Sequence, residues 1–413
     1  MKNMLQKSFA LLVLISTLSL ASCKPNDAPS TSDDIPATSE NPTISEPSSE
    51  ESSSLIPVEK EEWWDDEVFR DPNKNHYVPE DEVVLEDGDF HTKTQKAYIE
   101  SSWNYYFKYS HVAGGSEQSK PRGVKIELNS INDLYVELST KEDLTDSFVY
   151  KLDGSDKPFV KNLLGGTKYY YRTSNIKNTF TSPVKTITTS NLFPRNLDID
   201  GVTNVRDLGG YTSKLGGTIK QNMVIRGARL NENETSEPVK LITPEGYETL
   251  TKTIGVKTEI DLRSSAEEAG HMNNEVFPEI EYHLVPMNTR NVDNIMLKFR
   301  PQIKEVFDIF ADINNYPIYY HCKIGTDRTG MISYLLGALL GMDQDSLLTD
   351  YLFSNFGNIG SQRMEYDLEE DYYDVLRETY KKPTLQLCVE EFLLEIGVTK
   401  ENIETIKSIL IEK

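Results

Sequence analysis

The chain has 413 residues, with 43 Lys and Arg against 66 Asp and Glu, so its formal net charge at pH 7 is −23. That length is enough for two domains and a tail. The acidic balance argues against nucleic acid as a partner, because binding to its phosphates needs a basic face. A small phosphorylated substrate stays compatible with this charge, since one local cradle can be positive in an acidic protein.

The N-terminus has the pattern of an export signal. Two lysines precede the apolar run Phe9–Leu20, which is too short to span a bilayer as a mature helix. The segment Leu20–Cys23 resembles a bacterial lipobox; the alternative is an ordinary signal peptide with an incidental cysteine. We expect residues 1–22 to be a lipoprotein signal peptide, and a lipid on Cys23 to anchor the exported chain to the cell membrane. No later run reaches the ~20 apolar residues of a transmembrane helix.

Residues 23–60 are rich in Ser, Pro, Glu and Thr, which predicts a disordered spacer. For residues 61–190 we expect a fibronectin type III-like β-sandwich with an N-terminal extension. Its predicted strands are Gly123–Leu128, Leu134–Leu138, Phe148–Leu152, Lys168–Thr173 and Val184–Thr188. The segment Leu163–Arg172 resembles the fibronectin segment in which a tyrosine packs at a strand corner. We therefore assign Tyr169–Tyr171 to core and corner packing, and keep a ligand-binding aromatic patch as the alternative.

From residue 198 to 413 the pattern changes to alternating strands and helices. The predicted strands are Val256–Leu262, Tyr282–Pro286 and Tyr316–Tyr320; the predicted helices are Leu297–Ile313, Met331–Leu340, Leu347–Phe353, Glu365–Lys381 and Thr384–Glu395. The fold class expected for the chain is α/β, a mainly parallel sheet with flanking helices, preceded by a small all-β sandwich. Ligands in such sheets bind beyond the carboxyl ends of the strands.

The segment His321–Gly330 has the pattern of an anion-binding loop with a nucleophile. Cys322 follows the predicted strand Tyr316–Tyr320, and Arg328 lies at the far end of the loop, before the predicted helix Met331–Leu340. Backbone N–H groups and the positive end of the helix dipole meet there, so a thiolate and a phosphate are both stabilised. The planar fork of an arginine can bind two phosphate oxygens. The alternative is a buried core cysteine with an arginine nearby by chance.

This loop resembles the signature of the cysteine-dependent protein tyrosine phosphatases, and further motifs narrow the resemblance to a bacterial branch that includes lipid-active and dual-specificity members. The motifs occur in the order expected for that branch: Asn204–Tyr211, Val224–Gly227, Asp261–Ser264, the loop itself, and Asp350–Leu352 with Ser354 and Asn355. The resemblance covers about Asp198 to Lys413. One departure is Thr326, where the branch often has a lysine before the loop aspartate; Lys323 is a candidate source of that charge.

The resemblance implies roles for the residues of the loop, some individually and the others as a group. Cys322 attacks phosphorus, and Thr329 eases departure of the thiolate. The phosphate-binding group comprises Lys323, Ile324, Gly325, Thr326, Asp327, Arg328 and Thr329. The general acid is open between Asp327, which we favour, and Asp261 and Asp207, for which the alternative is an ion pair with Arg263 or Arg206. Arg206, Arg226 and Arg263 are either substrate ligands or structural partners.

The function expected from these residues is hydrolysis of a phosphomonoester by an exported, membrane-anchored enzyme, most simply protein phosphotyrosine, through a phosphocysteine intermediate. The substrate partner is a phosphorylated protein or a phospholipid. The alternatives are a phosphoinositide or sugar-phosphate phosphatase and a catalytically weak surface-binding protein. We expect no metal and no cofactor, because the histidines show no ligand spacing. Cys388 is assigned to helix packing, and the cysteine pattern requires no disulfide.

Overall fold

The computed structural model describes residues 77–101, 117–232, 239–264, 277–290, 292, 294–364 and 366–413. The predicted signal peptide, the lipid-bearing Cys23 and the linker up to residue 60 lie outside these residues. None of the helices in the described ranges is long and apolar enough to cross a membrane.

The described chain begins with a short helix and an all-β part. Helix α2 (Lys93–Glu100) starts at a reciprocal cap, in which Thr92 and Gln95 each bind the backbone N–H of the other. The strands that follow are β1 (Val124–Lys125), β2 (Tyr135–Ser139), β3 (Phe148–Lys151), β4 (Phe159–Val160), β5 (Lys168–Ser174) and β6 (Lys185–Thr188). The five predicted strands are therefore confirmed, and β4 was not predicted.

These strands form two antiparallel layers around an apolar core. Strands β3, β2, β5 and β6 make a four-stranded sheet in that order, and β1 pairs with β4. Val136, Leu138 and Tyr171 are among the core residues. The backbone N–H of Leu164 donates to the hydroxyl oxygen of Tyr169 at 3.0 Å, and Tyr169 itself is buried. This contact confirms the packing role assigned to Tyr169.

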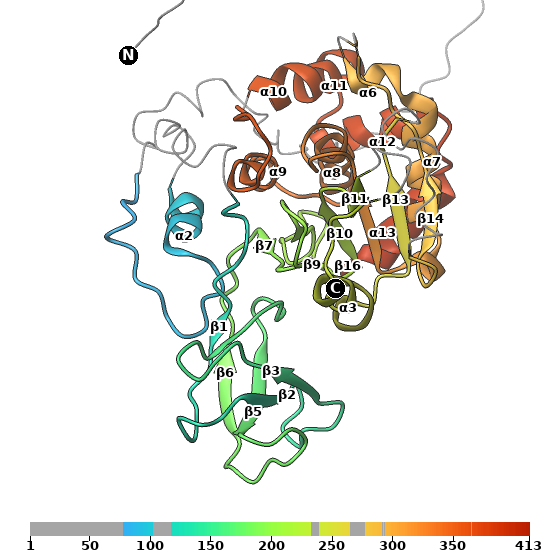
Figure 1. Cartoon of the computed structure of the whole chain (residues 1–413). Helices are drawn as coiled ribbons and strands as arrows, with labels where there is room; N and C mark the ends of the chain where they lie inside the picture. The colour runs from blue at the N-terminus through green and yellow to red at the C-terminus, as the bar shows by residue number, and fades with distance from the viewer. Residues whose placement is uncertain are drawn as a thin grey trace, which may run out of the picture. The chain divides into compact units, whose positions relative to one another are not determined.

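The second part is an α/β layer structure (Figure 1). Its six-stranded sheet has the order β14-β13-β15-β10-β8-β7. Strands β14, β13, β15 and β10 are parallel, and β8 pairs antiparallel with both β10 and β7. The strands are β7 (Arg195–Asn196), β8 (Arg206–Asp207), β10 (Val224–Gly227), β13 (Thr258–Asp261), β14 (Glu281–Leu284) and β15 (Ile318–His321). The predicted fold class is confirmed.

Shorter pairings and the helices complete this part. Strand β9 (Thr218–Ile219) pairs with β16 (Ile411–Glu412), and β11 (Asn231–Glu232) pairs with β12 (Val239–Lys240). The helices are α3 (Pro244–Glu248), α6 (Ile295–Lys298), α7 (Arg300–Phe310), α8 (Asp327–Leu339), α9 (Gln344–Leu352), α10 (Tyr366–Leu368), α11 (Asp374–Tyr380), α12 (Leu385–Glu395) and α13 (Lys400–Leu410).

Adjacent residues of the central strands point to opposite faces of the sheet, as strand geometry requires. Ile318 and Tyr320 of β15 lie in the larger core, which contains residues of α7, α8, α12 and α13. Tyr319 lies in a separate core on the other face, with Leu250 and Ile254 of the helical turn that follows α3. Both faces are therefore covered, and the functional end of the sheet is the edge where the parallel strands finish.

The helix predictions need correction in several places. The single helix predicted over Glu365–Lys381 is interrupted at Glu369–Tyr373, between α10 and α11. The single helix predicted over Leu297–Ile313 is divided into α6 and α7, because Pro301 lies in the first turn of α7 and starts a helix there. Helix α13 was not predicted, although Thr399 caps its N-terminus and Ile403, Ile406 and Ile409 repeat at helical spacing on its buried side.

Candidate functional site

The catalytic-loop segment Cys322–Thr326 joins the central strand to a buried helix. Strand β15 lies between β13 and β10 and ends at His321, and α8 begins at Asp327. Gly325 has φ +73°, and a Cβ there would lie 2.4 Å from the backbone of Gly227. Only glycine fits this turn without displacing β10. Cys322 therefore lies at the carboxyl end of the middle strand, where the sequence placed it.

The carbonyl groups of the loop are bound from behind. The Asn204 amide donates to the carbonyl oxygens of Ile324 and Gly325 at 3.0 and 3.1 Å. Arg226 also donates to the Gly325 carbonyl at 3.0 Å, and Arg229 donates to that of Lys323 at 2.8 Å. A trans peptide points its N–H opposite to its C=O, so these contacts turn the following N–H groups toward the inside of the loop. The result is a ring of donors suited to a tetrahedral anion.

A buried ionic network holds these supporting side chains. Asp350 accepts hydrogen bonds from Arg206 at 2.8 Å and from Arg226, and Arg206 donates to the Asn204 side-chain oxygen at 2.6 Å. The Ser354 hydroxyl accepts a further hydrogen bond from Arg206. Burial would raise the pKa of Asp350, but the two arginines outweigh it and lower that pKa. Two arginines facing one carboxylate leave positive charge behind the loop, which favours a bound anion.

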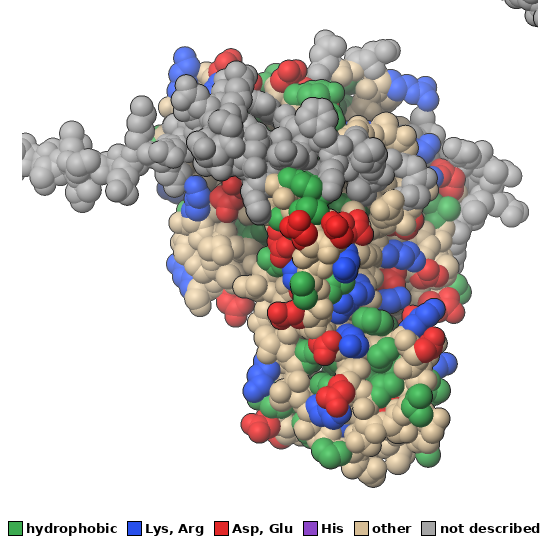
Figure 2. Space-filling view, turned by 90° about the vertical axis from the view of Figure 1, so that its left-hand side faces the viewer, with side chains coloured by type: hydrophobic (Ala, Val, Ile, Leu, Met, Phe, Trp, Pro, Cys, Tyr) green, Lys and Arg blue, Asp and Glu red, His purple; other side chains and the backbone are tan. Residues whose placement is uncertain are grey.

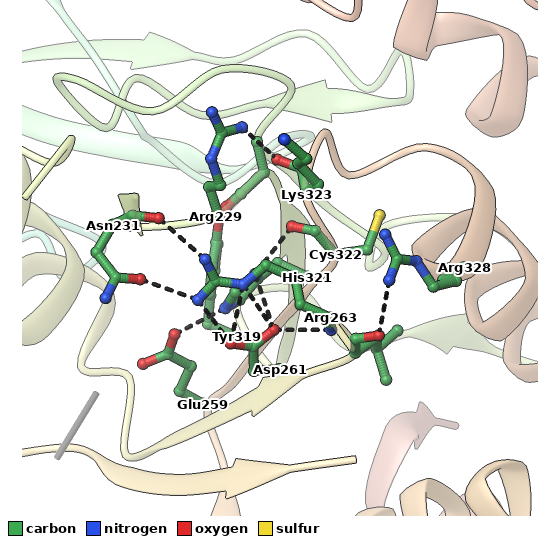
Figure 3. A network of polar contacts seen from close by, with 12 residues as sticks. Arg229, Asn231, Glu259, Asp261, Arg263, Tyr319, His321, Cys322, Lys323 and Arg328 are labelled. Carbon is green, nitrogen blue, oxygen red and sulfur yellow. Dashed lines mark hydrogen bonds and ion pairs between the residues drawn. The ribbon is translucent and has the colours of Figure 1, made fainter. Parts of the chain in front are cut away.

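Cys322 and Arg328 lie beside each other within the site. The Cys322 sulfur points away from the neighbouring carboxylates and toward the Arg328 guanidinium (Figure 3). Arg328 donates to the carbonyl oxygens of Leu262 and Met287 at 3.2 and 2.9 Å, which fixes the orientation of its fork. Burial alone would raise the pKa of the Cys322 thiol, but Arg328 and then the Thr329 hydroxyl lower it below its ordinary value. A nucleophilic thiolate is therefore favoured.

His321 adds a second buried contact network on the strand side of the nucleophile. One ring nitrogen lies 2.7 Å from a carboxylate oxygen of Glu259, and the other lies 3.0 Å from the Cys322 carbonyl oxygen. Burial would lower the pKa of His321, but Asp261 and Glu259 raise it on balance. A protonated imidazole can donate at both nitrogens. Glu259, in the middle of β13, is a partner that the sequence interpretation missed.

Asp261, one of the three candidate acids, is enclosed by structural partners. Its oxygens accept hydrogen bonds from the Arg263 backbone and side chain at 2.7 to 3.0 Å, and from the Tyr282 hydroxyl at 3.0 Å. Arg263 also binds Asn231 (Figure 3). Burial raises the pKa of Asp261, but His321 and Arg263 lower it strongly. These contacts favour the ion-pair alternative for Asp261, and its role as the acid stays an untested prediction.

Asp207 is also an ion-pair residue, with a partner different from the one expected. It is fully buried and pairs with Arg195 at 2.5 Å, while also accepting from the backbone of Gly209 and Asn222. Arg206, the expected partner, instead binds Asp350. The sequence interpretation assumed the neighbouring arginine, but adjacent residues of a strand point to opposite faces.

Asp327 occupies the rim of the site. Its side chain is 46% exposed, and it accepts two hydrogen bonds from the Arg363 guanidinium at 2.7 and 3.0 Å. Arg363 lies in the segment after α9 and was not identified from the sequence. The interaction raises the pKa of Arg363 above its ordinary value, with the hydrogen bond to Asp327 as the largest cause. Among the three candidate acids, Asp327 is the one with access to solvent.

The remaining loop side chains divide between back and front. Thr326 is buried, and its hydroxyl lies 3.3 Å from the Asn204 amide, so it belongs to the supporting side of the loop. Lys323 is partly exposed, which keeps it a candidate for substrate contact.

Within the described ranges, no group of three acidic, histidine or cysteine side chains is arranged to hold a metal ion. Cys388 is unpaired and fully buried in α12, which confirms its packing role.

The fold and the loop define a cysteine-nucleophile, anion-binding α/β domain. A family model described as the tyrosine phosphatase family matches residues 197–412. The chain belongs to this family.

Two relatives carry related names. A protein of Cupriavidus necator, provisionally named a tyrosine-protein phosphatase, is 27% identical over 188 residues, and a tyrosine-protein phosphatase of Nostoc commune is 28% identical over 120 residues. The matches cover 40% and 24% of this chain, and 64% and 41% of the relatives' own lengths.

Two solved structures are more distant. The core catalytic domain of the PP-IP phosphatase SIW14 from S. cerevisiae is 18% identical with a TM-score of 0.26, covering 38% of this chain and 86% of its own. P. aeruginosa TpbA is 16% identical with a TM-score of 0.27, covering 43% and 87%. Similarities this distant carry no argument about the substrate of this chain.

Proposed function

We propose that the chain hydrolyses phosphomonoesters through a phosphocysteine intermediate, with protein phosphotyrosine as the substrate. The observation that carries the proposal is the pairing of Cys322 with Arg328 inside a loop whose carbonyl groups are bound from behind. A binding module without catalysis has no need of a thiol whose pKa is lowered by a neighbouring arginine. The loop recognises the phosphoryl group and leaves its carrier to the rim.

In the first step a Cys322 Sγ–P bond forms while the P–O bond to the leaving group breaks. The inward N–H groups and the Arg328 fork hold the equatorial oxygens, where charge redistributes. The leaving oxygen takes a proton from the general acid, for which Asp327 is the proposed donor. In the second step water attacks phosphorus, the Sγ–P bond breaks, and the water proton passes to the Asp327 carboxylate. Thr329, buried next to the thiol, stabilises the departing thiolate.

The direct test is the nucleophile. Cys322→Ser is expected to bind inorganic phosphate or vanadate but to lose turnover by several orders of magnitude, because an alkoxide is not available at neutral pH. Arg328→Lys is expected to be severely impaired as well, since a point charge does not replace the two-oxygen fork. Cys388→Ser is the matched control, since it removes a buried thiol from α12 and should keep the activity. Retained turnover in Cys322→Ser would exclude the mechanism.

Substrate preference is tested by a panel of phosphotyrosine peptide, phosphoserine peptide, sugar phosphate and phosphoinositide vesicles. The proposal expects the highest kcat/KM on phosphotyrosine, because an aryl leaving group is the better one and the rim acid serves it. A phosphoinositide preference would instead favour the lipid-phosphatase alternative. No turnover on any member of the panel would favour the alternative that the chain is a catalytically weak binding protein.

The proposal includes export and membrane attachment through a lipid on Cys23. Its support is the apolar run Phe9–Leu20 and the lipobox-like segment after it. Cys23→Ala is expected to move the protein from the membrane fraction to the soluble or unprocessed pool. Mass spectrometry of the mature N-terminus decides the matter, since an unmodified residue other than Cys23 there would contradict the anchor.

A further inference from the structure

Arg363 is held in place on its own segment before it meets the loop. The Asn355 side chain binds the Arg363 backbone on both sides, accepting from its N–H at 2.8 Å and donating to its carbonyl oxygen at 2.9 Å. One guanidinium nitrogen donates to the backbone and hydroxyl oxygens of Ser361 at 3.0 and 2.7 Å. The other two nitrogens face Asp327. The arginine is therefore preorganised as a planar two-point clamp on one carboxylate.

The charges around Asp327 make this clamp significant. Besides Arg363, the groups that interact electrostatically with Asp327 include Cys322 of the loop, Tyr351 of α9, and Asp371 and Tyr372 of the turn after α10. Asp367 of α10 acts on Arg363 and Asp371. The pKa of Asp371 is raised by burial and by its acidic neighbours Asp367, Glu370 and Asp327. Asp327 thus interacts with acidic and phenolic groups, and Arg363 is a cation that contacts it directly.

We propose that Arg363 is a positioning residue that fixes the Asp327 carboxyl group at the rim of the catalytic loop, in the orientation from which Asp327 exchanges protons with the leaving group and the attacking water. This inference rests on the proposed phosphatase function. A carboxylate held by a bidentate arginine is ready to accept the proton of the attacking water in the second step.

The experiment compares kcat and KM for a poor and a good leaving group. With Arg363→Gln the Asp327 carboxyl group loses its fixed orientation, so kcat on phenyl phosphate should fall by about tenfold with little change in KM. A more activated aryl phosphate needs less proton donation and should show a smaller loss of kcat. Arg363→Lys, which restores the charge without the fork, should return part of the lost rate. Circular dichroism confirms that each variant is folded.

Two controls isolate the contact. Arg300→Gln removes the same charge from another partly exposed ion pair, with Glu395 at 2.7 Å, and should leave kcat on both substrates unchanged. In an Asp327→Asn background, Arg363→Gln should produce no further loss of kcat. An unchanged kcat in the single variant, or an equal loss with and without Asp327, would overturn the inference. A wild-type protein inert toward every aryl phosphate would overturn the proposed function itself, and is thereby distinguished from a failure of Arg363 alone.

Discussion

The two sides of the catalytic loop handle charge in different ways. Behind the loop, Arg206, Arg226 and Asp350 are almost completely buried, with side-chain exposures of 1%, 0% and 3%. At the rim, the Asp327 and Arg363 side chains are 46% and 16% exposed. Buried charges depend on one another, because removing one partner leaves the others without solvent or counter-charge. A rim pair is screened by water and contributes little to stability. The rear network therefore builds the loop, and the rim pair can adjust chemistry.

Figure 2 shows how charged side chains are distributed over one face of the molecule. Acidic and basic side chains lie intermixed over its described lower part, without a broad patch of one sign. The net negative charge of the chain is compatible with a locally positive site, because the arginines that favour a bound anion, Arg206 and Arg226, lie behind the loop.

Among the substitutions that test the contrast between the rear network and the rim pair, Asp350→Asn should have the largest effect on stability. It leaves Arg206 and Arg226 without their shared carboxylate, and the free energy of unfolding should fall by about 3–5 kcal/mol. Urea denaturation measures the loss. The control is Asp374→Asn, which breaks a half-exposed pair with Arg377 and should cost less than about 1 kcal/mol. Equal effects of the two substitutions would contradict the contrast between rear and rim.

His91 tests the effect of burial on a single base, because the fold keeps this buried side chain neutral. It contacts the Pro194 carbonyl at 2.8 Å, and burial lowers its pKa to about 4. As pH falls from about 6.5 to about 4, the unfolded chain takes up a proton that the folded chain refuses, so stability decreases by up to about 3 kcal/mol. His91→Gln should flatten this part of the stability profile. An unchanged slope in that variant would show that other groups carry the acid sensitivity.

Asp261→Asn tests whether a buried aspartate next to the site is structural. Loss of its charge weakens the contacts to Arg263, so unfolding should become easier by about 2 kcal/mol. Turnover should fall by a similar factor for phosphotyrosine and for a more activated aryl phosphate, because no proton transfer is removed. A selective loss on phosphotyrosine would instead identify Asp261 as the acid, and Asp327 would lose that assignment.

Arg363→Gln should have the smallest effect on stability, below about 1 kcal/mol, because its partner is half exposed and screened. Thermal unfolding measured beside the rate constants checks this. A large destabilisation would place the rim pair in the same class as the rear network, and would remove the distinction on which the comparison depends.

Much of this arrangement could be predicted from the sequence because strand and helix periodicities are local. The loop, its lead-in strand and the helix after it are contiguous, so their geometry follows from neighbouring residues. The partners of the charged residues could not be predicted in this way. Asp207 pairs with Arg195 rather than Arg206, and Asp327 pairs with Arg363, 36 positions away. Such pairs depend on the direction in which each side chain leaves its strand or loop, which sequence spacing alone leaves open.

The contacts of Asn204 and Asp350 also bear on how the site forms. Asn204 reaches residues 120 and 121 positions later, and Arg206 reaches Asp350 across 144 positions. Contacts of such long range close late, because loop closure must precede them. During synthesis the cysteine leaves the ribosome before Asp350 and Arg363 do. The nascent chain therefore holds a thiol in an unfinished loop, and its phosphate-binding geometry arises only when nearly the whole domain has been made.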